Sequence, residues 1–209
     1  MLLACLLAGC GSNVVLEPPT IPVPLTEKIH ASVGLRMPEE FHQFVHEEEI
    51  IGREEWSIDL GSSNAVLFEQ LFGYMFDKVA ILNADDDPEQ FGLDALIEPS
   101  IDAFEFSVPN QSKTEAFAVW IRYRIKVFDD EGDQVANWPV SAYGKSQTAS
   151  VSGTKALQRA AILAMRDAAA LMIMKLDDAT GISKIAQARI AMSESSAASE
   201  AKEVENAAE

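Results

Sequence analysis

The chain has 209 residues, of which 33 are acidic and 16 basic, and its formal net charge is −17. A surface of this sign repels nucleic-acid phosphates, so nucleic-acid binding is excluded as a main activity. The apolar share of 48% is normal for a globular protein, and the length suits one domain with a tail. We interpret the acidity chiefly as a source of solubility, with complementarity to a basic partner as the alternative.

The first ten residues have the pattern of a secretory signal that ends in a lipidation site. The apolar run 2–8 is too short to cross a bilayer, which needs about 20 apolar residues, but suits a signal peptide. It ends in Leu7-Ala8-Gly9-Cys10, which resembles the lipobox of bacterial lipoproteins. The resemblance implies removal of residues 1–9 and acylation of Cys10 with chains such as palmitate. Because Gly11 rather than Asp follows, it also implies sorting to the periplasmic face of the outer membrane.

No Lys or Arg precedes this apolar run, so either the true translation start lies upstream or the chain is truncated. With Cys5 in the signal and Cys10 acylated, the mature body has no cysteine for a disulfide, a thiolate metal site or a nucleophile. The segment 10–24 is rich in proline, which predicts an extended lipidated tether that precedes a globular domain over 25–180.

Alternating apolar residues predict the first strands. The segment 28–36 alternates, and so do Trp56, Ile58 and Leu60. Between these strands, 41–51 is expected to be a loop or one irregular helical turn. A helix is predicted over 64–76, with Ser and Asn side chains of 61–64 capping its first amides, followed by a strand over 78–82. The run Asp85-Asp86-Asp87-Pro88 is typical of a turn.

The second half of the chain begins with a long predicted strand over 95–106, in which Pro99 indicates an edge or a bulge. The segment 116–128 has the clearest alternation of the chain, and a turn at 129–132 returns it as a strand over 135–147. An alanine-rich helix is predicted over 154–176. The Ala-, Ser- and Glu-rich tail 181–209 is expected to be helical to about Met192 and disordered beyond.

This order of elements predicts an α+β fold, a two-layer α/β sandwich with a mixed, mostly antiparallel sheet and two helices packed on one face. The lipobox, the Pro-rich segment, the long hairpin and the alanine-rich helix around Ala156–Ala169 resemble small periplasmic lipoproteins with a TolB-N-terminal-like body. That group includes lipopolysaccharide-assembly and export accessory lipoproteins. The resemblance implies a non-enzymatic recruiting or scaffolding role, and it transfers no binding residue, because no group-specific motif matches.

No sequence motif for catalysis is present. His42 and His46 precede three glutamates, but they lack the HExxH order of a zinc protease, and we interpret the segment as a solvated acidic loop. The three consecutive aspartates lack the spacing of a calcium loop. The G-x-S-x-G, phosphate-loop and dinucleotide patterns are absent as well. We therefore expect no enzyme, no metal site and no cofactor.

One side of the predicted strand 116–128 is a candidate interaction face. It has Trp120, Arg122, Arg124 and Lys126, and we expect Trp138 on the returning strand to lie near Trp120. Tryptophan and arginine are enriched at binding hot spots, so a basic, aromatic face on an acidic chain favours docking of a protein or an anionic glycan. The alternative is a solvated face in which the cations pair with acidic residues across the strands.

Together these patterns predict a membrane-anchored periplasmic lipoprotein that acts as a non-enzymatic accessory or scaffold in cell-envelope assembly or export. Its partners would be the membrane, through the N-terminal lipid, and an envelope protein, and a homo-oligomer is compatible with this role. The alternative function is a lipid- or glycan-binding periplasmic module that holds its ligand between the sheet and the helices.

Overall fold

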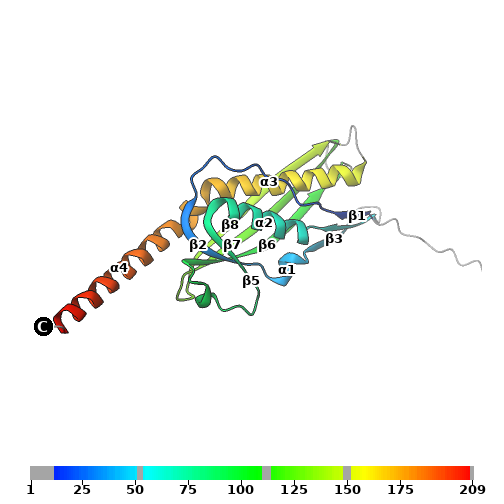
Figure 1. Cartoon of the computed structure of the whole chain (residues 1–209). Helices are drawn as coiled ribbons and strands as arrows, with labels where there is room; N and C mark the ends of the chain where they lie inside the picture. Colours follow the sequence, from blue (N-terminus) through cyan, green and yellow to red (C-terminus); the bar gives the residue numbers. More distant parts are fainter. Residues whose placement is uncertain (1–11, 51–53, 110–113, 148–151, 208–209) are drawn as a thin grey trace, which may run out of the picture.

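The computed structural model describes residues 12–50, 54–109, 114–147 and 152–207 (Figure 1). The predicted signal peptide and the predicted lipidation site at Cys10 lie outside these residues. The elements, in chain order, are β1 (Ser12–Val15), β2 (Ile29–Arg36), α1 (Glu39–His42), β3 (Val45–Ile50), β4 (Glu54–Asp59), α2 (Gly61–Met75), β5 (Phe76–Leu82), the 3-10 helix η1 (Pro88–Phe91), β6 (Ala95–Ser107), β7 (Ala116–Phe128), β8 (Gln134–Gln147), α3 (Gly153–Thr180) and α4 (Ile182–Ala207).

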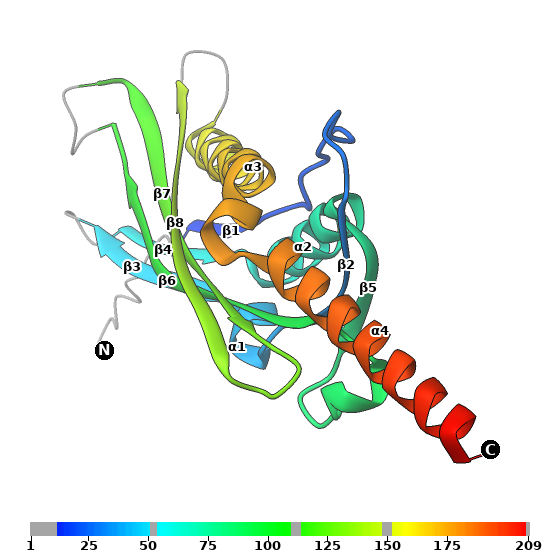
Figure 2. The same ribbon diagram turned by 90° about the vertical axis from the view of Figure 1, so that its left-hand side faces the viewer.

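A five-stranded mixed sheet in the order β5-β2-β6-β7-β8 forms the centre of the fold. The strand β2 pairs in parallel with β5 and β6, whereas β6, β7 and β8 pair antiparallel over most of their lengths. The helices α2 and α3 cover one face of this sheet (Figures 1 and 2). The predicted α+β class is confirmed. A second, three-stranded sheet, β1-β4-β3, lies beside the first and was not predicted.

The main core lies between the five-stranded sheet and the helices α2 and α3. Its largest fully buried side chains include Phe68, Leu71 and Phe72 of α2 and Ile121, Tyr123 and Ile125 of β7. The alanine-rich face of α3 lets this helix lie directly on β8. A Cβ atom on Gly144 of β8 would be 2.0 Å from the Ala160 carbonyl oxygen and 2.4 Å from the Ala164 amide nitrogen. Glycine is therefore required where the backbones of α3 and β8 meet.

Residues 12–21 pack against the body, which differs from the free tether expected over 10–24. The strand β1 pairs in parallel with β4, and Val14, Leu16 and Ile21 are buried. The Ser63 hydroxyl donates to the Leu16 carbonyl oxygen, and the Arg166 guanidinium donates to a backbone carbonyl further along the segment. The strand β1 ends before the first proline, and the proline-containing residues that follow form no helix or strand but still bury Ile21.

The segment 41–51 was predicted as a loop or a helical turn, and this is wrong for its second half. After the short helix α1, residues Val45–Ile50 form β3, which pairs antiparallel with the whole of β4. Exposed Glu47 and Glu49 alternate with half-buried His46 and Glu48, so the period of a strand is present but masked by charge. Pairing with β4 satisfies the backbone groups of this polar run.

The helix α2 begins at Gly61, three residues before the predicted start, and the predicted side-chain cap does not form. Ser63 and Asn64 belong to the first turn of the helix, and both are buried. The Asp59 carboxylate instead accepts a hydrogen bond of 3.1 Å from the Gly61 amide. The Tyr123 hydroxyl donates to the Asn64 side-chain oxygen at 2.7 Å, and burial raises the pKa of this hydroxyl. The hydrogen bond between Asn64 and Tyr123 therefore joins α2 to β7 within the core.

The remaining elements agree closely with the sequence. The hairpin of β7 and β8, the strands β2, β5 and β6, and the helix α3 all form where they were predicted. Pro99 of β6 lies beyond the three residues that pair with β2, next to a register shift, so it occupies a locally free edge. The helix α4 continues to Ala207, past the expected limit at Met192, and projects away from the body (Figures 1 and 2). Among the described residues, no helix is long and apolar enough to cross a membrane.

Candidate functional site

The five-stranded sheet turns one face away from α2 and α3, and we call this the outer face. It includes Trp120, Arg122, Arg124 and Lys126 of β7. The residues between and beside them point to the helix side and are buried: Val119, Ile121, Tyr123, Ile125 and Val127. Four of the five predicted site residues therefore share this face. Two features stand out on it, an aromatic patch near the beginning of β7 and a cleft near its end.

The aromatic patch consists of Trp120, Arg122 and Tyr143. Trp120 and Tyr143 are direct neighbours across β7 and β8, with ring centroids 5.1 Å apart, and they are 45% and 43% exposed. The exposed Arg122 beside them makes no hydrogen bond or ion pair with any other described residue. The patch lines a shallow groove of about 350 Å³ together with Glu105 and Ser141. Its composition is that of a binding hot spot.

Trp138 was expected beside Trp120, and this prediction is wrong. The register of the hairpin sets Trp138 opposite Ile125, so its side chain points to the helix side and packs against the main core. Tyr143 occupies the position expected for Trp138. Side chains alternate along a strand, so a partner on the wrong parity lies on the other face of the sheet.

Arg124 is held by polar contacts, unlike Arg122 of the aromatic patch. The Arg124 guanidinium donates to both carboxylate oxygens of Asp102, one of them at 3.0 Å, and to the Asn137 side-chain oxygen at 2.9 Å. Donation of these hydrogen bonds to Asp102 raises the pKa of Arg124. Lys126 lies opposite Glu98, the acidic partner of Arg36. Pairing with an acidic residue across the strands, the alternative weighed for this face, therefore holds for Arg124.

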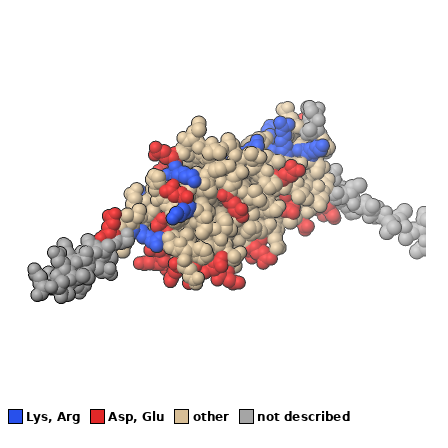
Figure 3. All heavy atoms as spheres, viewed as in Figure 1, with Lys and Arg blue, Asp and Glu red and all other residues tan. Residues whose placement is uncertain are grey.

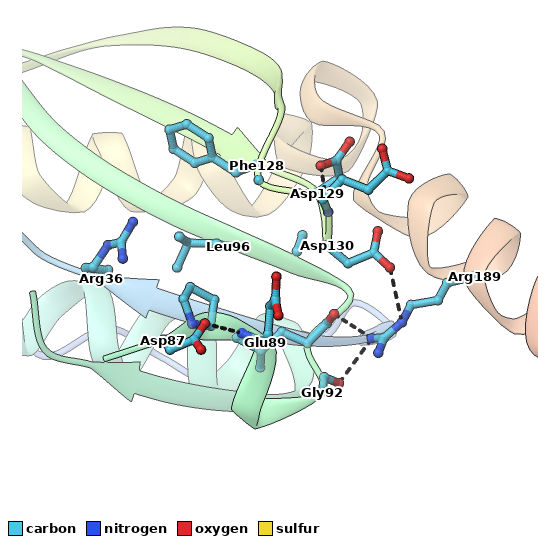
Figure 4. A pocket seen from close by; sticks show the side chains of 14 residues that line it. Arg36, Asp87, Glu89, Gly92, Leu96, Phe128, Asp129, Asp130 and Arg189 are labelled. Carbon is cyan, nitrogen blue, oxygen red and sulfur yellow. Dashed lines mark hydrogen bonds and ion pairs between the residues drawn. The ribbon is translucent and has the colours of Figure 1, made fainter. Parts of the chain in front are cut away.

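The second feature is a cleft of about 410 Å³, which we call the acidic cleft (Figure 4). Its apolar floor is made of Leu93, Leu96 and Phe128. Its rim has two loops with five carboxylates: Asp87, Glu89, Asp129, Asp130 and Glu131. These loops come from the η1 region and from the β7–β8 turn, which are about 40 residues apart in the chain. Pairing of β6 with β7 brings them together.

Local hydrogen bonds shape both loops of the rim. The Asp129 carboxylate accepts from the amides of Glu131 and Asp133 at 3.1 and 2.9 Å, and Gly132 has a φ of +84° that closes the turn. The Asp87 carboxylate caps η1 by accepting from the Glu89 amide at 3.1 Å. These short polar side chains in turn positions follow ordinary turn chemistry. The predicted turn at Asp85-Asp86-Asp87-Pro88 is confirmed, because the Asp86 amide donates to the Asn83 carbonyl oxygen and η1 begins at Pro88.

Arg189 of α4 ties the C-terminal helix to this rim (Figure 4). Its guanidinium donates to the carbonyl oxygens of Gly92, at 3.1 Å, and Leu93, and it pairs with Asp94 at 3.1 Å and Asp130 at 3.6 Å. No sequence pattern indicated this contact, because Arg189 lies about 60 residues beyond the turn that it contacts. The acidic cleft is therefore a site that sequence reasoning missed.

The two histidines weighed as metal ligands do not share a helix face. The helix α1 ends at His42, whereas His46 lies on β3, where its ring contacts Phe104 at a centroid distance of 5.0 Å. The His46 Nε2 atom is 3.1 Å from the Glu48 carboxylate. Within the described residues, no group of three or more His, Cys, Asp or Glu side chains is arranged to hold a metal ion.

No protein-family model matches the chain, and no curated protein matches it in sequence. Among solved structures, the chain is similar to the hypothetical protein CT253 of Chlamydia trachomatis, with a TM-score of 0.44, 11% identity, and coverage of 72% of this chain and 98% of that one. It is also similar to a candidate lipoprotein of Caulobacter crescentus, with a TM-score of 0.37, 14% identity and coverage of 54% and 79%. A third similar structure is lipoprotein GNA1162 of Neisseria meningitidis, with a TM-score of 0.29, 10% identity and coverage of 58% and 87%. These similarities are too low to carry an argument about function.

Proposed function

We propose that this chain is a lipoprotein, acylated at Cys10, on the periplasmic face of the outer membrane. In this proposal it acts as a non-enzymatic accessory in envelope assembly or export and binds an envelope protein through the aromatic patch. The lipobox supports the anchor, and the exposed Trp120–Tyr143 pair beside a free Arg122 supports the docking surface. The second of these observations carries the functional part of the proposal.

Because the N-terminal segment is folded from Ser12 on, the body of an acylated protein would lie directly at the membrane surface. Ser12 already belongs to β1, and a chain of two residues spans at most about 7 Å. An acyl group on Cys10 would therefore keep the β1 end of the body close to the bilayer surface. The expected 15-residue tether would have allowed a much larger range of positions.

The direction of α3 relative to the N-terminal segment sets the orientation that the whole body would have at the membrane. The Gln158 amide donates to the Val15 carbonyl at 3.3 Å, and the Arg166 guanidinium donates to the Thr20 carbonyl at 3.0 Å. The N-terminal segment and α3 therefore run side by side in the same direction. The beginning of α3 lies near the anchored end, and α4 leaves from the opposite end (Figure 1). In an acylated protein, α4 would point away from the membrane.

The buried layer between sheet and helices disfavours the alternative function of a ligand held there. Phe68, Phe72 and Tyr123 are fully buried in this layer, and the Phe68 ring contacts the other two. At Gly144 the backbones of α3 and β8 are in direct contact. A lipid or glycan would have to displace packed aromatic side chains, which costs several kcal/mol. Binding on the outer surface needs no such displacement.

Site-specific photocrosslinking in the native membrane tests the docking proposal. A photoreactive amino acid at Arg122 should give a discrete adduct with an envelope protein, whereas the same group at Met174, which is 64% exposed on α3, should not. Trp120→Ala with Tyr143→Ala should remove the adduct formed from a photoreactive group at Ser141, with little change in melting temperature, because both rings are half exposed. Equal adducts from Arg122 and Met174 would refute the proposed surface.

A further inference from the structure

We propose that the acidic cleft binds a short cationic peptide segment of a partner protein, one in which Lys or Arg residues alternate with apolar residues. The cleft lies on the same outer face as the aromatic patch but at the other end of β7. The proposal does not depend on acylation of Cys10 or on the aromatic patch. It rests on the apolar floor of the cleft, the charge of its rim and the commitment of its two arginines.

The floor belongs to a small apolar cluster that is separate from the main core. This cluster consists of Leu82, Leu93 and Leu96, with half-buried Phe128 packed against it, and all but Leu82 line the cleft. Gly34 lies beneath this cluster, because a Cβ atom there would be 2.6 Å from a Leu82 methyl carbon and 2.7 Å from a Leu93 methyl carbon. The cluster is therefore closed from below by β2 and open toward the cleft. An apolar side chain placed on it would lose contact with water and gain about 25 cal/mol per Å² of buried area.

The rim gives the cleft a negative charge that its arginines do not cancel. Arg36 is paired with Glu98 at 2.6 Å, and Arg189 is paired with Asp94 and Asp130. Both guanidinium groups are thus occupied by carboxylates, of which only Asp130 belongs to the rim, so an anionic ligand would have to break existing ion pairs. The cleft would repel phosphates and acidic peptides.

Two rim carboxylates remain free to receive a cation. The side-chain carboxylates of Glu89 and Glu131 accept no hydrogen bond and form no ion pair with a described residue, whereas those of Asp87 and Asp129 accept hydrogen bonds from backbone amides in their turns. Glu89 lines the cleft from the η1 region and Glu131 from the β7–β8 turn. A ligand that puts ammonium or guanidinium groups toward both loops and an apolar side chain on the floor would match the site. An extended peptide in which Lys or Arg alternates with an apolar residue separates the two kinds of side chain, because successive side chains point in opposite directions.

The experiment uses the purified full-length chain in detergent and a blocked pentapeptide, acetyl-Lys-Leu-Lys-Leu-Lys-amide, followed by NMR titration at low salt. We expect saturable shifts of the amide signals of Leu93, Leu96 and Gly132. The variant Glu89→Gln/Glu131→Gln should weaken binding about tenfold. The control Glu47→Gln/Glu49→Gln removes the same charge from exposed positions on β3 and should leave binding unchanged. The peptide with Glu in place of Lys should not bind.

The outcomes separate the site from the general charge of the molecule. Equal weakening by both double variants would show attraction to the overall negative surface and would overturn the proposal, as would binding of the Glu peptide. Absence of saturable shifts with the Lys peptide would also overturn it. Trp120→Ala/Tyr143→Ala should bind the Lys peptide as the wild type does. Failure of the docking proposal at the aromatic patch would therefore leave this result unaffected.

Discussion

The two ends of the molecule use the same sheet face in different ways. At the β1 end, the outer face exposes two aromatic rings in tilted contact and an arginine that has no ion-pair partner among the described residues, and at the α4 end it has an apolar floor surrounded by carboxylates. The two features are eight residues apart along β7, a distance of about 25 Å. One face of a single sheet thus has two surfaces of different chemistry, and in the two proposals each surface would bind a different partner segment at a fixed separation.

The charge distribution agrees with this difference. On the side of the molecule that carries α3, acidic side chains predominate along the lower edge, whereas lysine and arginine gather above the beginning of α3 and near the start of α4 (Figure 3). Lys155 and Arg159 are exposed in the first turns of α3, at the β1 end. The net charge of −17 is therefore not spread evenly, and partners that approach the two ends meet different local fields.

The largest expected effect comes from the contact between α3 and β8, which holds the β1 end together. Gly144→Ala would place a Cβ atom into the backbone of Ala160 and Ala164, so we expect a loss of about 3 kcal/mol or more in the free energy of unfolding. Urea unfolding measures it. The control is Gly73→Ala, where no atom lies within 4 Å, and this change in a helix should be neutral or stabilising. Wild-type stability of Gly144→Ala would contradict the close approach.

The next effect distinguishes a packed N-terminal segment from a free tether. Leu16 is 2% exposed, so Leu16→Ala should lower the free energy of unfolding by about 2–3 kcal/mol. Val23, in the same segment, is 65% exposed, and Val23→Ala should change it by less than about 0.5 kcal/mol. If both variants unfold at the same urea concentration as the wild type, the segment is a tether and the body is not held at the membrane surface.

At the α4 end we expect a smaller and more local effect. Arg189→Ala removes the ion pairs to Asp94 and Asp130 and the hydrogen bonds to two carbonyl oxygens at the cleft rim. Because Arg189 is partly exposed, the loss of stability should be about 1 kcal/mol. Hydrogen exchange should become faster in α4 and in the loop 87–94, while exchange in β7 and β8 stays unchanged. Faster exchange throughout the sheet would mean that the two ends are not independent.

The smallest effect belongs to an exposed pair outside both ends. His30 Nδ1 lies 2.9 Å from the Asp77 carboxylate, and this hydrogen bond raises the pKa of His30 above 6.5. The small stabilisation from the charged pair is therefore fully present below pH 6.5 and is lost as the pH rises through the pKa of the folded protein. An NMR titration should show that Asp77→Asn lowers the pKa of His30 toward 6.5. An unchanged titration would show that the pair is not formed in solution.

Local periodicity was enough to predict the elements of the central sheet and its helices. The hairpin of β7 and β8, with a glycine-closed turn, formed in its predicted position because all of its signals lie within 32 neighbouring residues. By contrast, β1 and β3 were missed. Both depend on pairing with β4, and β1 lies more than 40 residues away from it. The strand β3 pairs with the next strand of the chain, but its charged residues mask the alternation, whereas β1 is short and becomes a strand only through its distant partner.

The candidate site shows the same limit. Alternation in β7 identified Trp120 and Arg122 on one face, but the neighbour of Trp120 depends on the hairpin register, which selects Tyr143 rather than Trp138. The acidic cleft combines segments around Arg36, 87–96, 128–132 and Arg189. Each segment alone has the composition of an ordinary turn or helix surface. Only the pairing of β2 with β6 and of β6 with β7 brings them together.

The central claim is that Cys10 is acylated and holds this body at a membrane. Mass spectrometry of the N-terminal peptide from protein expressed in a Gram-negative host tests it directly, with Cys10→Ala as the matched variant. We predict a peptide that begins at Cys10 and carries the mass of the attached acyl chains, together with release of the Cys10→Ala variant from the membrane fraction. An unmodified peptide that still contains residues 1–9, and equal fractionation of both proteins, would contradict the account.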